Sequence, residues 1–218
     1  ACSGGDGDAG APGSAAQTPA VITGALQTAD AFANLSFEKP TSLTSARDGS
    51  NRLFVTQKEG LIRVFDNRAD APSSAVFLDL RAKVDASTDD SGLLGIAFDP
   101  AFAANGHAYV IYVTLAPTRK VRLSRFTTST GNRNALDPAS ERVVYEYDHA
   151  RVWHYGGWLA FGRDGMLYVS TGDNIFDAAL QDVASPYGKV LRMRINADGS
   201  ATVPPDNPFR SFTWAMGL

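Results

Sequence analysis

The sequence contains very little cysteine, little histidine and no long apolar run. Only one of its 218 residues is cysteine, Cys2, so no intrachain disulfide can form. No stretch reaches the roughly 18 consecutive apolar residues of a membrane-spanning helix. The net charge is −3, and no long basic run is present. This argues against a nucleic-acid-binding protein, which needs a basic face for the phosphates.

The first 20 residues are rich in glycine, alanine, serine and proline, and such a tract is expected to be disordered. A cysteine followed by this composition resembles the mature start of a bacterial lipoprotein, in which the cysteine is acylated. We therefore expect residues 1–31 to be a disordered tether, anchored to a membrane only through a lipid on Cys2. The expected location is the periplasm or cell envelope. The alternative is a disordered tail with an incidental cysteine.

Long helical periodicity is absent from Phe32 onward. Short apolar or alternating runs are separated by glycine, aspartate, asparagine and proline, which predicts an all-β fold. Similar groups of strands begin near residues 41, 94 and 158. Repetition at intervals of roughly 50 to 60 residues is typical of β-propeller blades of about four strands each. We predict about three antiparallel blades over residues 32–218.

Several strands have a specific place in this prediction. Residues 109–113, "YVIYV", are apolar on both faces and predict a strand covered on both sides. Residues 120–126, "KVRLSRF", alternate as a half-exposed edge strand does. Residues 74–80 and 142–148 are candidate fourth strands. Residues 213–218, "TWAMGL", resemble the first strand of a further blade, so we expect the chain to be incomplete at both ends.

Five motifs occur in order along the chain: "SGLLGIAFDPAFAANGHAYVIYV", "HYGGWLAFGRDGMLYVSTGD", "GKVLRMRINADGS", "VPPDNPF" and "WAMGL". Together they resemble the soluble quinoprotein glucose dehydrogenase and aldose sugar dehydrogenase family, also called the glucose/sorbosone dehydrogenase family. The resemblance covers residues 32–218. It implies a six-bladed propeller that binds pyrroloquinoline quinone (PQQ) and Ca²⁺. It also implies oxidation of the C1 hydroxyl of an aldose, with electrons passing to an external acceptor.

The resemblance implies that the Ca²⁺ ligands and most cofactor-binding residues belong to later blades. We therefore assign no metal ligand in this chain, and we expect the chain alone to be inactive. The expected partners are a small aldose and an electron acceptor.

Three histidines are available as a general base, and the resemblance favours His154, which stands before Gly156 and Gly157. A neutral imidazole is available near pH 7, because the ordinary pKa of histidine is about 6.5. The two glycines permit positive φ angles and close approach by a flat cofactor. His149 lacks the Gly-Gly context and ranks well below His154. His107 is most simply a residue of a blade.

Four further side chains carry expectations. Asp173 either orients the imidazole or is a turn aspartate bonded to its own backbone. Asp90 stands where the family usually has a glutamine that faces the active site. Trp158 either stacks on a sugar or belongs to the core. Arg192 is expected to be a solvated charge on an edge strand.

Two other functions compete with the dehydrogenase. A non-catalytic binding module of the hedgehog-interacting type shares the propeller, although such ectodomains are disulfide-rich. A Ca²⁺-dependent propeller lactonase would not need a histidine before Gly-Gly.

Overall fold

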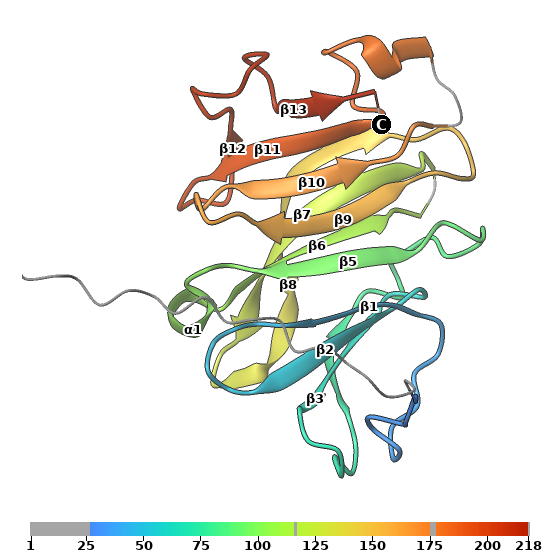
Figure 1. Ribbon diagram of the computed structural model, residues 1–218, viewed down its shortest axis with the longest axis vertical. Coiled ribbons are helices and arrows are strands. Elements are labelled where there is room, and N and C mark those ends of the chain that lie inside the picture. Colours follow the sequence, from blue (N-terminus) through green and yellow to red (C-terminus); the bar gives the residue numbers. More distant parts are fainter. Residues whose placement is uncertain (1–26, 116, 175–177, 218) are drawn as a thin grey trace, which may run out of the picture. The chain divides into compact units, whose positions relative to one another are not determined.

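The computed structural model describes residues 27–115, 117–174 and 178–217. Cys2 and most of the expected tether lie outside the described residues, so the lipid anchor stays a prediction. From Phe32 onward the chain forms one compact unit built almost entirely of antiparallel strands (Figure 1). The predicted all-β fold is confirmed. No helix among the described residues is long and apolar enough to span a membrane.

The strands form three antiparallel sheets, each made from one continuous segment of the chain. The first sheet contains, in spatial order, β1 (Pro40–Ser45), β2 (Arg52–Gln57), β3 (Leu61–Asp66) and β4 (Ala75–Asp79). The second contains β5 (Leu93–Phe98), β6 (His107–Val113), β7 (Lys120–Ser129) and β8 (Asn132–Asp148). A single helical turn, α1 (Phe102–Asn105), joins β5 to β6.

The third sheet contains β9 (Gly156–Phe161), β10 (Leu167–Thr171), β11 (Lys189–Ile195) and β13 (Thr213–Met216). The short strand β12 (Ala201–Thr202) forms a hairpin with the end of β11, and a 3₁₀ turn, η1 (Ala178–Gln181), precedes β11. Three consecutive antiparallel sheets, of four, four and five strands, are blades of a β-propeller, as the sequence predicts.

Two hydrophobic clusters join the three sheets, and β6 contributes to both. Val110 and Tyr112 pack in the cluster between the first and second sheets. Tyr109 and Ile111 pack in the cluster between the second and third sheets. Side chains alternate between the faces of a strand, so this placement follows directly from the sequence. The prediction that residues 109–113 are covered on both sides is confirmed.

The first strands of the sheets, β1, β5 and β9, lie side by side (Figure 1). Their close approach depends on glycine. A Cβ atom at Gly95 of β5 would lie 2.8 Å from the carbonyl oxygen of Gly157 in β9. A Cβ atom at Gly157 would lie 2.4 Å from the Cβ of Leu94. Side chains at these positions would push the inner strands apart.

Two strand assignments made from the sequence are wrong. Residues 120–126 belong to β7, which pairs with β6 on one side and β8 on the other, so this strand is not an edge. Polar and apolar residues alternate in β7 because Lys120 and Arg122 form ion pairs with Glu146 on β8, at 2.7 and 2.8 Å. The residues 213–216 form β13, which pairs with β11 as an outer strand of the third sheet and does not start another blade.

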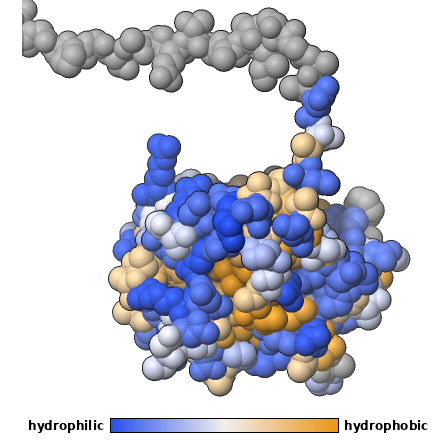
Figure 2. Space-filling model, turned by 90° about the horizontal axis from the view of Figure 1, so that it is seen from below, coloured by the Kyte–Doolittle hydropathy of each residue, from blue (hydrophilic) through white to orange (hydrophobic). Residues whose placement is uncertain are grey.

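The first sheet also carries a smaller apolar cluster on the face opposite to the second sheet. Its buried members are Val55, Phe65 and Ala71, and partly buried phenylalanines pack against them. Figure 2, viewed from the side of the first sheet, shows apolar side chains gathered in the middle of the view and surrounded by polar ones.

Candidate active site

His154 lies two residues before β9 and has an unusual backbone conformation. Its φ angle is +63°, in the left-handed region that non-glycine residues seldom adopt. Such conformations persist only where surrounding contacts impose them, and they concentrate at functional sites. The side chain is 46% exposed, so the imidazole is accessible to a ligand.

Two carboxylates contact His154. Asp173 Oδ1 lies 2.6 Å from His154 Nδ1, and the Asp173 side chain is only 18% exposed. The backbone N–H of His154 donates to Asp90 Oδ2 at 3.1 Å. His154 and Asp90 precede β9 and β5, whereas Asp173 follows β10. The structure therefore brings together three of the residues predicted from the sequence.

The pairing of β9 with β10 explains why Asp173 meets His154. Gly156 lies opposite Thr171 in this antiparallel pair. Continuing the same register two residues beyond the ladder places position 154 opposite position 173. Each strand contributes its polar residue just outside the sheet, where the imidazole and the carboxylate can pair without disturbing the ladder.

Glycines allow the backbone of His154 to lie against the end of β10. A Cβ atom at Gly172 would lie 1.4 Å from the carbonyl oxygen of His154, so only glycine fits there. Gly156 has a φ of +76°, and a Cβ atom on it would lie 2.6 Å from the Gly172 nitrogen. The close approaches at Gly156 and Gly157 are thus made by protein atoms. Their expected contact with a cofactor stays a prediction.

His149 supports the backbone of His154, a role that the sequence did not reveal. Its ring is fully buried, with Nε2 at 3.3 Å from the carbonyl oxygen of His154 and Nδ1 at 3.2 Å from that of Arg151. It also stacks on Tyr155, with ring centroids 4.2 Å apart. Burial lowers the pKa of the His149 imidazole below its ordinary value, although the two carbonyl acceptors oppose this shift.

Trp158 is 63% exposed, so it is not a core residue. It lines an open cavity of about 310 Å³ together with residues 41–44 of β1 and residues 94–96 of β5. An exposed indole on an inner strand offers a flat apolar surface. Its expected contact with a sugar stays a prediction.

The described residues suit proton transfer better than metal binding. A histidine paired with a carboxylate can accept a proton and stabilise the resulting charge. The part of the chain that the structure describes contains no group of three or more His, Cys, Asp or Glu residues that could hold a metal ion. We therefore assign no Ca²⁺ ligand among these residues.

Residues 37–217 match the model of the Glucose / Sorbosone dehydrogenase family. The chain belongs to this family. Among solved structures, the PQQ-bound aldose sugar dehydrogenase of Streptomyces coelicolor is 28% identical, with a TM-score of 0.68, over 84% of this chain and 51% of that one. A putative glucose dehydrogenase of Thermus thermophilus is 33% identical, with a TM-score of 0.63, over 79% of this chain and 47% of that one.

The chain is also similar to Hedgehog-interacting protein of Mus musculus. The two are 32% identical over 187 residues, which is 78% of this chain and 27% of that protein. The chain thus spans about half the length of the solved relatives and about a quarter of this one. The relatives of this chain therefore include proteins whose names describe enzymes and others whose names describe binding.

The expectation that Arg192 is a solvated charge on an edge strand is wrong. Arg192 is 5% exposed and is not a solvated charge. Its guanidinium donates to Asp164, Asp206 and Asn207, at 2.8 to 3.1 Å, and lies over the Trp214 ring. β13 pairs with β11, so β11, which carries Arg192, is not an edge strand. This network stabilises the third sheet. Its residues are remote from His154 in the sequence.

Proposed function

We propose that this chain provides the proton-accepting side of a PQQ-dependent aldose dehydrogenase, with His154 as the general base. The observation that supports the proposal is the 2.6 Å contact between His154 Nδ1 and Asp173 Oδ1. The accessible imidazole and the family membership agree with it. The aldose would be oxidised at its C1 hydroxyl to a lactone, and an external acceptor would receive the two electrons.

The tautomer of His154 follows from its partner. A hydrogen on Nδ1 is donated to the Asp173 carboxylate, which leaves Nε2 as the basic nitrogen. Nε2 takes the proton of the C1 hydroxyl as the C1 hydride leaves. Asp173 then faces a charged imidazolium and stabilises it. PQQ, when bound, supplies the quinone that accepts the hydride.

Asp90 takes part through its acceptor oxygen. It receives the backbone N–H of His154, and a glutamine carbonyl could accept the same bond. The family's usual glutamine can therefore be replaced by aspartate here while this contact is kept. A bound Ca²⁺ would need oxygen ligands from residues beyond those described.

The test is dye-linked aldose oxidation by the full-length protein, which supplies the later blades, loaded with PQQ and Ca²⁺. We expect His154→Ala to lower kcat by about 10²–10⁴-fold, the usual contribution of a positioned base. PQQ binding, measured separately by absorbance, should persist. His107→Ala, which removes a histidine from β6 in the second sheet, is the matched control and should leave kcat unchanged. Near-normal turnover of His154→Ala would refute the assignment.

A second function has one observation in its favour, the 32% identity to Hedgehog-interacting protein. A binding module would need neither an activated imidazole nor PQQ. If the full-length wild-type protein neither binds PQQ nor oxidises an aldose when PQQ and Ca²⁺ are supplied, the binding function takes precedence.

A further inference from the structure

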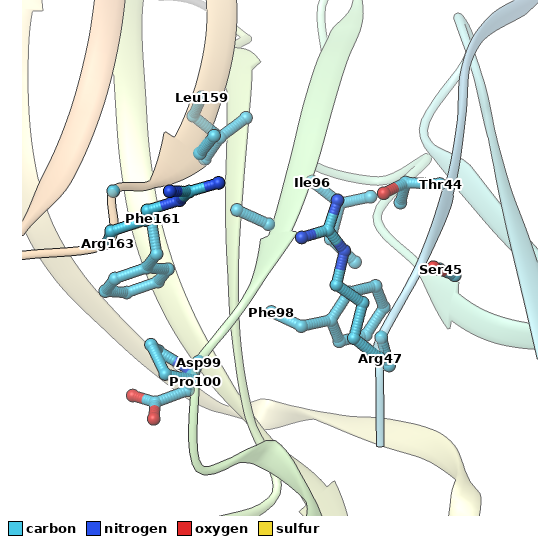
Figure 3. A pocket seen from close by; sticks show the side chains of 14 residues that line it. Thr44, Ser45, Arg47, Ile96, Phe98, Asp99, Pro100, Leu159, Phe161 and Arg163 are labelled. Atoms are coloured by element: carbon cyan, nitrogen blue, oxygen red, sulfur yellow. The ribbon is translucent and has the colours of Figure 1, made fainter. Parts of the chain in front are cut away.

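An open cavity of about 390 Å³ lies at the end of the inner strands that is remote from His154 (Figure 3). It is lined by the carboxyl ends of β1, β5 and β9 and by the residues that follow them. His154 precedes the amino end of β9. The six residues of β9, at about 3.3 Å each, separate the two places by roughly 20 Å. The cavity is thus distinct from the candidate active site.

Two arginines face this cavity from opposite sides. Arg47 follows β1, and Arg163 follows β9. In Figure 3 both guanidinium groups are directed into the cavity, whereas the carboxylate of Asp99 is directed away from them. Arg47 has a φ of +53°, a conformation that fixes where its side chain leaves the backbone.

The acidic neighbours of these arginines are already engaged by other groups. Asp48 pairs with Arg52 at 2.8 Å. Asp164 pairs with Arg192 at 2.9 Å. Within the described parts of the chain, no hydrogen bond or ion pair neutralises Arg47 or Arg163.

Asp99, the acid that lines the cavity, is also engaged. It accepts the N–H of Ala101 at 2.9 Å and the hydroxyl of Tyr109 at 3.4 Å. Both donors are uncharged, so Asp99 keeps its charge and offsets only one of the two guanidinium charges, which leaves the cavity with a net positive charge. An anion between two guanidinium groups would receive charge-assisted hydrogen bonds, the strongest kind available at a protein surface.

The rest of the lining is apolar. Ile96 and Phe98 come from β5, and Leu159 and Phe161 come from β9. A simple inorganic anion would use only the arginines. A small organic molecule with an anionic head and an apolar body would use both parts of the cavity.

We propose that this cavity binds a small organic anion, a phosphate monoester or a carboxylate, with Arg47 and Arg163 holding the anionic group. The apolar body contacts Phe98 and Phe161. The site is independent of the oxidation chemistry proposed for His154.

The test is calorimetric titration of the purified protein at low salt with phenyl phosphate and, separately, with benzoate. The ligand that binds more tightly identifies the preferred head group. Inorganic phosphate should bind more weakly than phenyl phosphate. Arg47→Gln and Arg163→Gln should each weaken the binding of the preferred anion by about tenfold or more. The double variant should lose it.

Arg194→Gln is the matched control, because it removes an exposed arginine from β11 outside the cavity and should bind as the wild type does. Melting curves will show that all variants are folded. His154→Ala should still bind the anion, which separates this proposal from the proposed function. Absence of binding by the wild type, or equal weakening by Arg194→Gln, would overturn the site.

Discussion

His154 is held by its backbone as much as by its ring. Its N–H donates to Asp90, its carbonyl oxygen lies against His149 Nε2, and its imidazole contacts Asp173. Three separate partners on one residue explain how a left-handed backbone conformation persists here. In its proposed role as the general base, His154 would lose little freedom when substrate binds, which would favour catalysis.

The residue whose substitution tests this arrangement most directly is Asp173. In Asp173→Asn the uncharged amide can no longer stabilise the imidazolium by charge. The amide can also donate to Nδ1, which allows the tautomer of His154 with its hydrogen on Nε2. We expect kcat for aldose oxidation to fall by at least about 100-fold, with a smaller change in KM. Asp198→Asn, in the exposed turn between β11 and β12, is the control and should change neither. A variant of Asp173 with unchanged kcat would show that this carboxylate is only a turn residue.

Among structural elements, the connection from β8 to β9 determines where His154 lies. His149 stands at its start and contacts the carbonyl groups of Arg151 and His154. The hydroxyl of Tyr155 also donates to the carbonyl of Arg151, at 3.0 Å. The connection is thus closed around a buried imidazole. Its stability should depend on the protonation of that ring.

The pKa shift of His149 fixes the direction of this dependence. Burial lowers the pKa in the folded protein, so the unfolded chain binds the proton more readily. The contribution to stability is fully present above about pH 6.5 and is lost as pH falls through the lower folded pKa. We expect the melting temperature of the wild type to fall more between pH 7.5 and pH 5 than that of His149→Gln. Scanning calorimetry would decide, and equal falls in the two proteins would contradict the argument.

The elements also show where sequence reasoning succeeds and where it fails. The apolar residues 109–113 predicted a doubly covered strand, because burial on both faces leaves a direct mark on composition. The alternation in residues 120–126 was misread, because cross-strand ion pairs with Glu146 produce the same pattern as solvent. β13 was assigned to the wrong blade, since its four residues carry no information about which strand they will pair with.

The same distinction applies to the candidate site. The meeting of His154 with Asp173 could be predicted only as one of two alternatives, because the register shift between Val169 and Thr171 that brings position 173 opposite position 154 is not visible in the sequence. The support from His149 could not. It depends on the course of an irregular connection, which no periodic pattern records. Arg192 was misjudged for a related reason, since the strand that covers it comes from a distant segment.

On the scale of the whole folded unit, the second sheet joins both hydrophobic clusters. Val110 belongs to the cluster shared with the first sheet, and its neighbour Ile111 belongs to the cluster shared with the third. Damage to either cluster therefore weakens the packing of β6. The three sheets should unfold together in one transition, as closely packed units of this size do.

The tryptophans make this cooperativity measurable. All three, Trp153, Trp158 and Trp214, lie in or beside the third sheet, whereas Val110 packs toward the first. Val110→Ala removes buried methyl groups and should cost about 2 kcal/mol, or roughly 4–8 °C in melting temperature. If the sheets unfold together, tryptophan fluorescence and far-ultraviolet circular dichroism will show the same lowered midpoint. Val76→Ala, at an exposed position of β4, should shift neither. A fluorescence midpoint that stays at the wild-type temperature while the dichroism midpoint falls would show that the third sheet unfolds independently.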